Sequence, residues 1–340
     1  MGNLRDWLQL FRSHTSPLEM TITITGSALA VGTIWDIKVL LFLIFGWLYH
    51  NAGYGHNSAE DYIQGYDQDD PNKAHHPLQR GAIDPRTARY VCIVLVFLTF
   101  LYGIFISEFN WTAMVLLAVI TFMGAVYNVA GKRMKGKFIP IAIAHSLLLP
   151  FAFFGSGGEI ENIVDYPYFK EAAGLALILG TVYLIVQIIY QIMIEGDLKD
   201  IDMEEASFLR TIGASVKDGV FTSSILARGF SYLTKSLSIA VLFWLIHAGK
   251  GGFIPYAVLS FFAVFMLVLD DKLMGDRKWD HSETLRSMAV MEVLSTFALV
   301  IAAAPLIGGT FEALIVMAFN IGYFMILNRY LWGTFLRPRV

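Results

Sequence analysis

The chain has 340 residues, of which 56% are hydrophobic and 16% charged, and its formal net charge is −3. Soluble domains carry about 25% charged residues, so this composition excludes an ordinary soluble domain and indicates a membrane protein surrounded by lipid. We expect no nucleic-acid partner, and the single cysteine, Cys92, excludes an intrachain disulfide.

Apolar runs close to the roughly 20 residues that a membrane helix requires recur along the whole chain. They are too long and too continuous for the strands of a membrane barrel, so helices must cross the bilayer. The first run is short and rich in threonine, and the last run also fits a peripheral helix, so we predict nine or ten crossings in an all-α, polytopic helical bundle. The predicted spans are 17–35, 38–56, 87–106, 111–130, 138–155, 171–194, 221–247, 253–269, 288–306 and 311–332.

Basic residues are distributed asymmetrically between the segments that join these spans. One set of segments holds 20 of the 25 basic residues, whereas the opposite set holds only Lys38, Lys170 and Lys250. Positively charged segments remain in the cytoplasm as a rule, so we expect the N-terminus and the basic segments to be cytoplasmic. Arg228 and Lys235 fall inside a predicted span, where ionisable residues are functional candidates.

Two acidic segments follow the second and the sixth predicted spans, both on the side assigned to the cytoplasm. They cover residues 57–84 and 195–213, and together they contain 12 of the 28 acidic residues. A single acidic segment is more often a solvated loop. Two segments at matched positions are harder to explain that way, because the orientation of the bundle does not require them.

The spacing within each segment favours oxygen ligands on one helix face. Asn57 and Asp61 are four residues apart, as are Asp200 and Glu204, and Asp197 lies three residues before Asp200. Residues three or four apart share a face if each helix continues past its apolar run. Two such faces opposite each other would make a strongly negative pocket that requires a cation. Oxygen-only ligands suit Mg²⁺, which commonly shares its coordination shell with phosphate oxygens. The sequence therefore predicts a magnesium–diphosphate site.

The order and spacing of several motifs resemble the UbiA-type intramembrane prenyltransferases. The stretch beginning "HNSAEDYIQGYD" is similar to the first aspartate-rich motif of that family in its relaxed N-x-x-x-D form, and "DYIQGYD" is similar to its menaquinone-type branch. "NKAHHPLQRGAIDPRTA", "VYNVAGKRMKGK" and "GDLKDIDMEEASFLRTIG" resemble, in order, the continuation of the first motif, a later basic loop and the second aspartate-rich motif. Ser58 and Glu204 depart from the family pattern, which has aspartate at both positions.

This resemblance implies one transmembrane domain over residues 1–340, with about nine helices around a central cavity. It also implies that Mg²⁺ and basic residues stabilise the diphosphate as it leaves a prenyl diphosphate, and that the prenyl group passes to an aromatic or other small acceptor. Asp61 and Asp200 are the expected catalytic residues. The metal ligands that it implies are Asn57, Asp61, Asp67, Asp197, Asp200 and Glu204. The substrate-binding candidates are Lys73, Arg80, Lys132, Lys199, Arg210, Tyr127 and Tyr190.

Gln187 and Gln191 are four residues apart on the span that leads into the second motif. They either hold a polar acceptor or form hydrogen bonds with a neighbouring helix, as membrane glutamines often do.

Two other activities use similar residues. A terpene cyclase on the same scaffold would ionise the same diphosphate and quench the cation on its own chain. An ion-coupled transporter would also place carboxylates in a helical bundle, but such sites lie near the membrane midplane, whereas these carboxylates follow the ends of spans.

Overall fold

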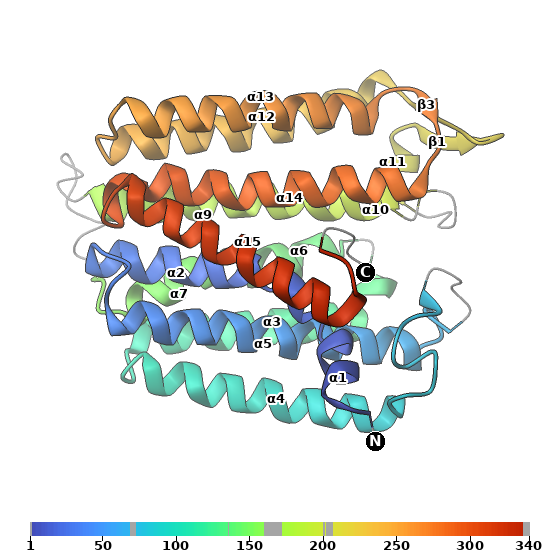
Figure 1. Ribbon diagram of the computed structural model, residues 1–340, viewed down its shortest axis with the longest axis horizontal. Helices are drawn as coiled ribbons and strands as arrows, with labels where there is room; N and C mark the ends of the chain where they lie inside the picture. The colour runs from blue at the N-terminus through green and yellow to red at the C-terminus, as the bar shows by residue number, and fades with distance from the viewer. Residues whose placement is uncertain are drawn as a thin grey trace. The chain divides into compact units, whose positions relative to one another are not determined.

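The computed structural model describes residues 2–68, 73–134, 136–159, 172–199, 201 and 207–335, with the side chain of Lys132 left out. These residues are mostly helical, which confirms the all-α prediction, and every predicted span coincides with helix over most of its length (Figure 1). The helices belong to two compact units, one formed by residues 1–160 and 314–340 and the other by residues 161–313. The single-domain organisation stays a prediction.

The first unit contains the first acidic segment. Polar side chains cap the start of three of its long helices. Asp36, Asp84 and Asn110 each accept a hydrogen bond from a backbone amide in the first helical turn. Its elements are α1 (Leu4–Leu10), η1 (Ser13–Thr15), α2 (Pro17–Val31), α3 (Ile37–Ile63), α4 (Pro85–Ile106), α5 (Trp111–Ala130), η3 (Gly131–Arg133), α6 (Phe138–Ser146), α7 (Leu148–Gly155) and most of α15 (Thr310–Trp332).

Helix α2 packs closely against its neighbours α3 and α7 because glycines lie at both contacts. A Cβ atom at Gly46 of α3 would meet the backbone oxygen of Glu19 at 2.7 Å, and one at Gly26 of α2 would meet the backbone of Leu149. Any larger side chain at either position would force the helices apart. This packing fixes the polar side chains of α2 against those of α3.

The second unit contains the second acidic segment. Its elements are α9 (Ala172–Tyr190), the π-helical turn η4 (Gln191–Gly196), α10 (Asp197–Lys199), α11 (Phe208–Thr211), β1 (Ala214–Lys217), β2 (Val220–Ser223), α12 (Ile225–Ala248), α13 (Phe253–Met274), β3 (Arg277–Lys278), α14 (His281–Ala303) and η5 (Ala304–Leu306). Within this unit α9 packs on α12, and α13 packs on both α12 and α14.

A small antiparallel sheet corrects the predicted boundary of the span 221–247. Strands β1, β2 and β3 pair in that order, and α12 begins only at Ile225. The turn between β1 and β2 contains Asp218 and Gly219, both with positive φ, which is the geometry that two-residue hairpin turns require. The apolar pair Val220–Phe221 therefore belongs to a hairpin and not to the start of a span.

Eight helical segments of the described chain are long and apolar enough to cross a membrane, which confirms a multi-pass integral membrane protein. They are 85–106, 111–130, 138–155, 172–199, 225–248, 253–274, 281–306 and 310–332. The other two predicted spans correspond to α2 and α3. Helix α2 has 15 residues and rises about 23 Å, which is shorter than the roughly 30 Å hydrocarbon core. Helix α3 has 27 residues and ends in the polar first motif.

Candidate active site

The first motif is built on the last turns of α3, which runs beyond the predicted span 38–56 to Ile63. Asn57 and Asp61 lie one turn apart on it, and the side-chain amide of Asn57 donates a hydrogen bond to Asp61 Oδ2 at 3.0 Å. The donation orients both side chains, so the amide oxygen of Asn57 remains as its metal-binding atom. The predicted extension of the helix past its apolar run is confirmed here.

Asp67 lies in the segment that follows α3 and forms an ion pair with Lys73. The distance from Lys73 Nζ to Asp67 Oδ1 is 2.5 Å, and both side chains are largely buried. A predicted metal ligand and a predicted phosphate contact are therefore each other's partners in this structure. Asp69 and Asp70 lie outside the described residues.

Glu60 is the most buried of the acids that the structure describes in the first segment, and it has a different role. It is only 1% exposed, and its two carboxylate oxygens accept hydrogen bonds from Arg89 Nε and from an Arg89 terminal nitrogen at 2.5 and 2.8 Å. His56 Nε2 lies 3.3 Å from the same carboxylate. Glu60 thus connects α3 to α4. In the sequence, the position of Glu60 beside Asp61 does not indicate this role. The signal that could have indicated it is Arg89, a basic residue one turn into α4.

Arg80 binds α1. Its guanidinium donates to the Asp6 carboxylate and, at 2.7 Å, to Gln9 Oε1. Beneath these contacts a buried apolar cluster joins α1 to the segment after the first motif; its core is Leu10, Ala59, Leu78, Ile83 and Ala88. These hydrogen bonds hold α1 over this segment, and the predicted contact of Arg80 with phosphate stays a prediction.

The end of α5 lies beside the first motif. The Asn128 side-chain amide donates to the backbone oxygen of Gly53 at 3.1 Å and lies 3.3 Å from His56 Nδ1. Tyr127, a predicted contact of the substrate, is partly buried one residue earlier. The side chain of Lys132 lies outside the described residues.

The second motif starts in the last two residues of the π-helical turn η4, Glu195 and Gly196. Asp197 is 1% exposed, and its Oδ2 accepts a hydrogen bond from the backbone amide of Leu209 at 3.1 Å. Arg210 Nε donates to the backbone oxygen of Ile201 at 3.0 Å, and Lys199 is partly buried at the end of α10. Asp200 and Glu204 lie outside the described residues. These hydrogen bonds therefore join the first part of the second motif, at Asp197 and Ile201, to its last part, at Leu209 and Arg210.

A buried ionic network surrounds the predicted substrate contacts of α9. Lys235 of α12 is fully buried; its Nζ donates to Gln187 Oε1 at 3.0 Å and lies 3.7 Å from the ring centroid of Tyr190. The Tyr190 hydroxyl donates to Asp270 of α13 at 2.6 Å.

The hydrogen bond of Gln187 agrees with the helix–helix alternative for this residue, while Gln191 is partly buried within η4. Asp270 could not be recognised as a partner from the sequence, because it follows a long apolar run and resembles a helix end.

The donor set of the first motif fits a hard cation. Among the residues that the structure describes, no group of three or more His, Cys, Asp or Glu side chains is placed to hold a metal ion. Magnesium, however, needs only one or two carboxylates when waters and phosphate oxygens complete its shell. The Asp61 carboxylate and the Asn57 amide oxygen supply that kind of partial shell.

Two known proteins are similar to the chain in sequence. The chain is 26% identical over 259 residues to the digeranylgeranylglyceryl phosphate synthase of Pyrococcus furiosus, covering 76% of this chain and 83% of the relative. It is 26% identical over 314 residues to the synthase of the same name from Thermococcus gammatolerans, covering 88% of this chain and 99% of the relative.

Two solved structures have a similar fold. One is a UbiA homologue from Aeropyrum pernix K1, with a TM-score of 0.59 at 15% identity over 85% of this chain and 96% of that one. The other is a UbiA homologue from Archaeoglobus fulgidus bound to GPP and Mg²⁺, with a TM-score of 0.55 at 15% identity over 88% of this chain and 99% of that one. The model of the UbiA prenyltransferase family matches residues 20–279. The chain is therefore a membrane prenyltransferase and belongs to the UbiA prenyltransferase family.

Proposed function

We propose that the protein transfers a prenyl group from a prenyl diphosphate to the free hydroxyl of a glycerol phosphate ether lipid, in a magnesium-dependent reaction. The observation that carries the proposal is the Asn57–Asp61 pair on the extended end of α3, in a chain of this family. The names of both archaeal relatives support a glycerophosphate acceptor. The Archaeoglobus fulgidus homologue that was solved with GPP and Mg²⁺ supports the donor and the metal.

The proposed metal ligands are those that the family resemblance implies. They are Asn57, Asp61 and Asp67 of the first motif and Asp197, Asp200 and Glu204 of the second. Bound magnesium would neutralise the charge that develops on the leaving diphosphate. Lys73, Lys199 and Arg210 are the proposed phosphate contacts, since ammonium and guanidinium groups bind phosphate oxygens well.

The remaining steps follow from the chemistry of an allylic diphosphate. The bond between C1 and the diphosphate oxygen breaks, and the electron pair leaves with the diphosphate. An acceptor oxygen then forms a bond to C1 and loses its proton. Apolar walls must exclude water, because water would quench the cation, and the long apolar helices of the chain are suited to supply such walls.

Product analysis tests the function directly. The purified protein is incubated with magnesium and with prenyl diphosphates of several chain lengths, with and without a monoprenyl glycerol phosphate ether. We expect diphosphate release to depend on the ether lipid and the product to gain one prenyl group. Release without any acceptor, together with a cyclic hydrocarbon product, would identify a terpene cyclase instead.

We further propose that both acidic segments lie on the cytoplasmic side. The count of basic residues in the segments that join the spans supports this side. Cysteines placed at Gln68 and Ala206 in a Cys92→Ser background should react only with a probe added from the cytoplasm. Labelling from the opposite side would contradict this topology.

A further inference from the structure

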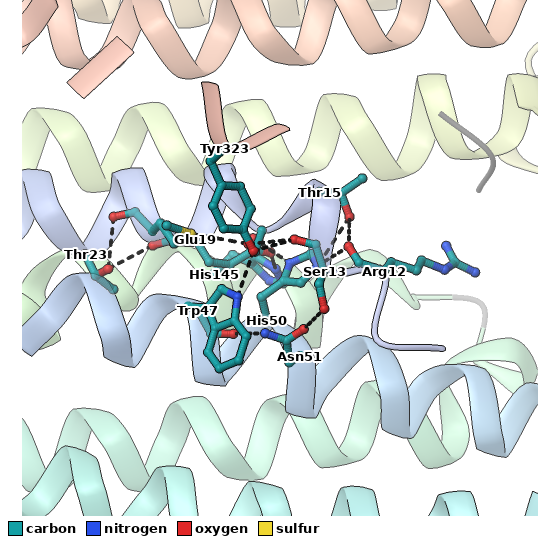
Figure 2. Close-up of polar contacts among 12 residues, drawn as sticks. Arg12, Ser13, Thr15, Glu19, Thr23, Trp47, His50, Asn51, His145 and Tyr323 are labelled. Atoms are coloured by element: carbon teal, nitrogen blue, oxygen red, sulfur yellow. Dashed lines mark hydrogen bonds and ion pairs between the residues drawn. The ribbon is translucent and has the colours of Figure 1, made fainter. Parts of the chain in front are cut away.

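Three titratable side chains from three helices of the first unit meet in its interior. Glu19 of α2 is fully buried, and its two carboxylate oxygens contact two histidines (Figure 2). Oε2 lies 2.8 Å from His50 Nδ1 on α3, and Oε1 lies 3.1 Å from His145 Nε2 on α6. Both histidines are also buried. Buried ionisable groups inside a membrane protein are costly, so a functional role is the first hypothesis for them.

The hydrogen bonds of His145 determine where its protons lie. Its Nδ1 lies 3.1 Å from the backbone oxygen of Ile141, and a carbonyl oxygen can only accept, so Nδ1 carries a proton. The contact between Nε2 and Glu19 needs a second proton. His145 and Glu19 therefore form an ion pair or share this proton, and the pair is neutral overall.

His50 differs from His145, because its outer nitrogen has two alternative partners. His50 Nε2 lies 3.2 Å from the Thr15 hydroxyl and 3.2 Å from the backbone oxygen of Arg12. The Thr15 hydroxyl is itself 2.8 Å from that backbone oxygen. When His50 is neutral with its proton on Nδ1, Thr15 can donate to Nε2. When His50 is protonated on both nitrogens, Nε2 donates to the Arg12 oxygen, and Thr15 rotates to donate to the same oxygen.

The cluster of Glu19, His50 and His145 can consequently accept one further proton with every donor and acceptor still paired. Thr15, which contacts His50, is partly exposed, so a proton can enter the cluster through the Thr15 hydroxyl. The neighbouring groups from the elements packed around it are Arg12 at the start of η1, His14 within η1, Tyr49 and Tyr54 on α3, and Tyr323 on α15. Tyr54 stacks on His50 at 4.2 Å between ring centroids, and Tyr49 meets His145 edge-on at 5.9 Å. These two rings pack directly against the histidines of the cluster.

The cluster shares a helix face with the first motif. His50 precedes Asn57 by seven residues and Asp61 by eleven, spacings that repeat the same face of α3. Two helical turns separate His50 from Asn57, which is about 10 Å along the axis. The reacting C1 atom lies next to the diphosphate, so an acceptor hydroxyl that attacks it must release its proton in this region.

We propose that the Glu19–His50–His145 cluster takes up the proton that the acceptor hydroxyl loses during prenyl transfer. This inference rests on the proposed function. As the acceptor oxygen bonds to C1 and its O–H bond breaks, the proton passes to Thr15 Oγ, and the Thr15 proton passes to His50 Nε2. The cluster gains one positive charge and returns the proton to water after the product has left.

The test is the pH dependence of prenyl transfer in the Glu19→Gln and Thr15→Val variants, measured in single turnovers with the ether-lipid acceptor. The Gln side chain keeps the shape of Glu19 but supplies one acceptor in place of two. At pH 7 we expect the transfer rate to fall about 100-fold in Glu19→Gln, within the range that general base catalysis contributes. The acidic limb of the wild-type pH profile should disappear in that variant. Thr15→Val should lose about 10-fold, and Thr15→Ser should restore the rate.

Two controls separate this role from a structural one. Tyr323→Phe removes a hydroxyl that binds Ser13 and Trp47 in the same region but does not contact the cluster, and it should keep the wild-type profile. Infrared spectra of the substrate-free protein should lose an ionised carboxylate band in Glu19→Gln. An unchanged pH profile in Glu19→Gln, or an equal rate loss in Thr15→Val and Thr15→Ser, would overturn the inference. Failure of the wild-type protein to transfer to any hydroxyl acceptor would refute the proposed function first.

Discussion

Replacing Arg89 by methionine should destabilise the first unit, because it leaves the Glu60 carboxylate buried without its main partner. The Glu60 side chain is 2% exposed and that of Arg89 is 41% exposed. Water therefore partly screens the attraction between the two charges at the arginine. The free-energy cost of burying the Glu60 carboxylate without a partner is not reduced in the same way, because that carboxylate is buried. Breaking a buried ion pair from one side costs about 3–5 kcal/mol. His56 can donate part of the lost hydrogen bonding, so we expect a loss of about 3 kcal/mol in unfolding free energy, a large share of a typical 5–15 kcal/mol.

The assay is reversible unfolding in detergent micelles, followed by circular dichroism, for Arg89→Met, Glu60→Gln and the double variant. The double variant leaves no buried charge, so it should lose only about 1 kcal/mol, within the net value of a hydrogen bond. Arg86→Met, an exposed position on the same helix, should change stability by less than about 0.5 kcal/mol. The reasoning is refuted if the losses of the two single variants simply add in the double variant.

Three further outcomes are expected. Prenyl transfer should stop when EDTA removes magnesium and return when magnesium is added back; full turnover in metal-free buffer would contradict the two-motif site. Asp61→Ala and Asp200→Ala should each lower turnover by at least about 100-fold while the protein still inserts and purifies, and near-normal activity in either would exclude that residue as a ligand.

Burial, with smaller contributions from His50 and Arg12, lowers the pKa of His14 to about 3 from its ordinary value of 6.5. The unfolded chain binds this proton below pH 6.5 and the folded chain does not, so stability should fall as the pH drops from 6.5 toward 3, by at most about 1.4 kcal/mol per unit. His14→Phe, which keeps the ring contacts with Phe324 and Trp332, should flatten that dependence in acid unfolding curves.

Local sequence spacing predicted the features that depend on one helix. The extension of α3 and the pairing of Asn57 with Asp61 follow from four-residue spacing and an apolar run, and both agree with the structure. The neighbour Glu60 has the same charge and looks equivalent in the sequence. It lies about 100° around the helix from Asp61, toward α4, and only the packing of two helices reveals that difference.

Features that depend on distant residues were not predictable from spacing. Glu19, His50 and His145 come from three helices separated by 31 and 95 residues, so no local pattern connects them. The hairpin of β1 and β2 did leave a local signal, the Asp218–Gly219 pair, but the apolar residues that follow it were assigned to a span. Hydropathy alone does not distinguish a short buried strand from the first turn of a membrane helix.

The π-helical turn η4 determines how the second motif responds to a change in chain length. Such a turn accommodates an additional residue within an otherwise α-helical segment, and here it lies between Gln187, which binds Lys235, and Asp197, which binds the backbone of Leu209. Deleting one residue between Gln191 and Gly196 would convert the turn to regular α-helix. Because the turn already absorbs that residue, the segment after it would keep its direction relative to α9. A deletion within the regular helix of α9 has no such turn to absorb it, so the segment after it would rotate by roughly 100°, and the carboxylate of Asp197 would point elsewhere although no residue of the motif had changed. The direction of this acid is therefore determined by the number of residues before it as much as by their identity.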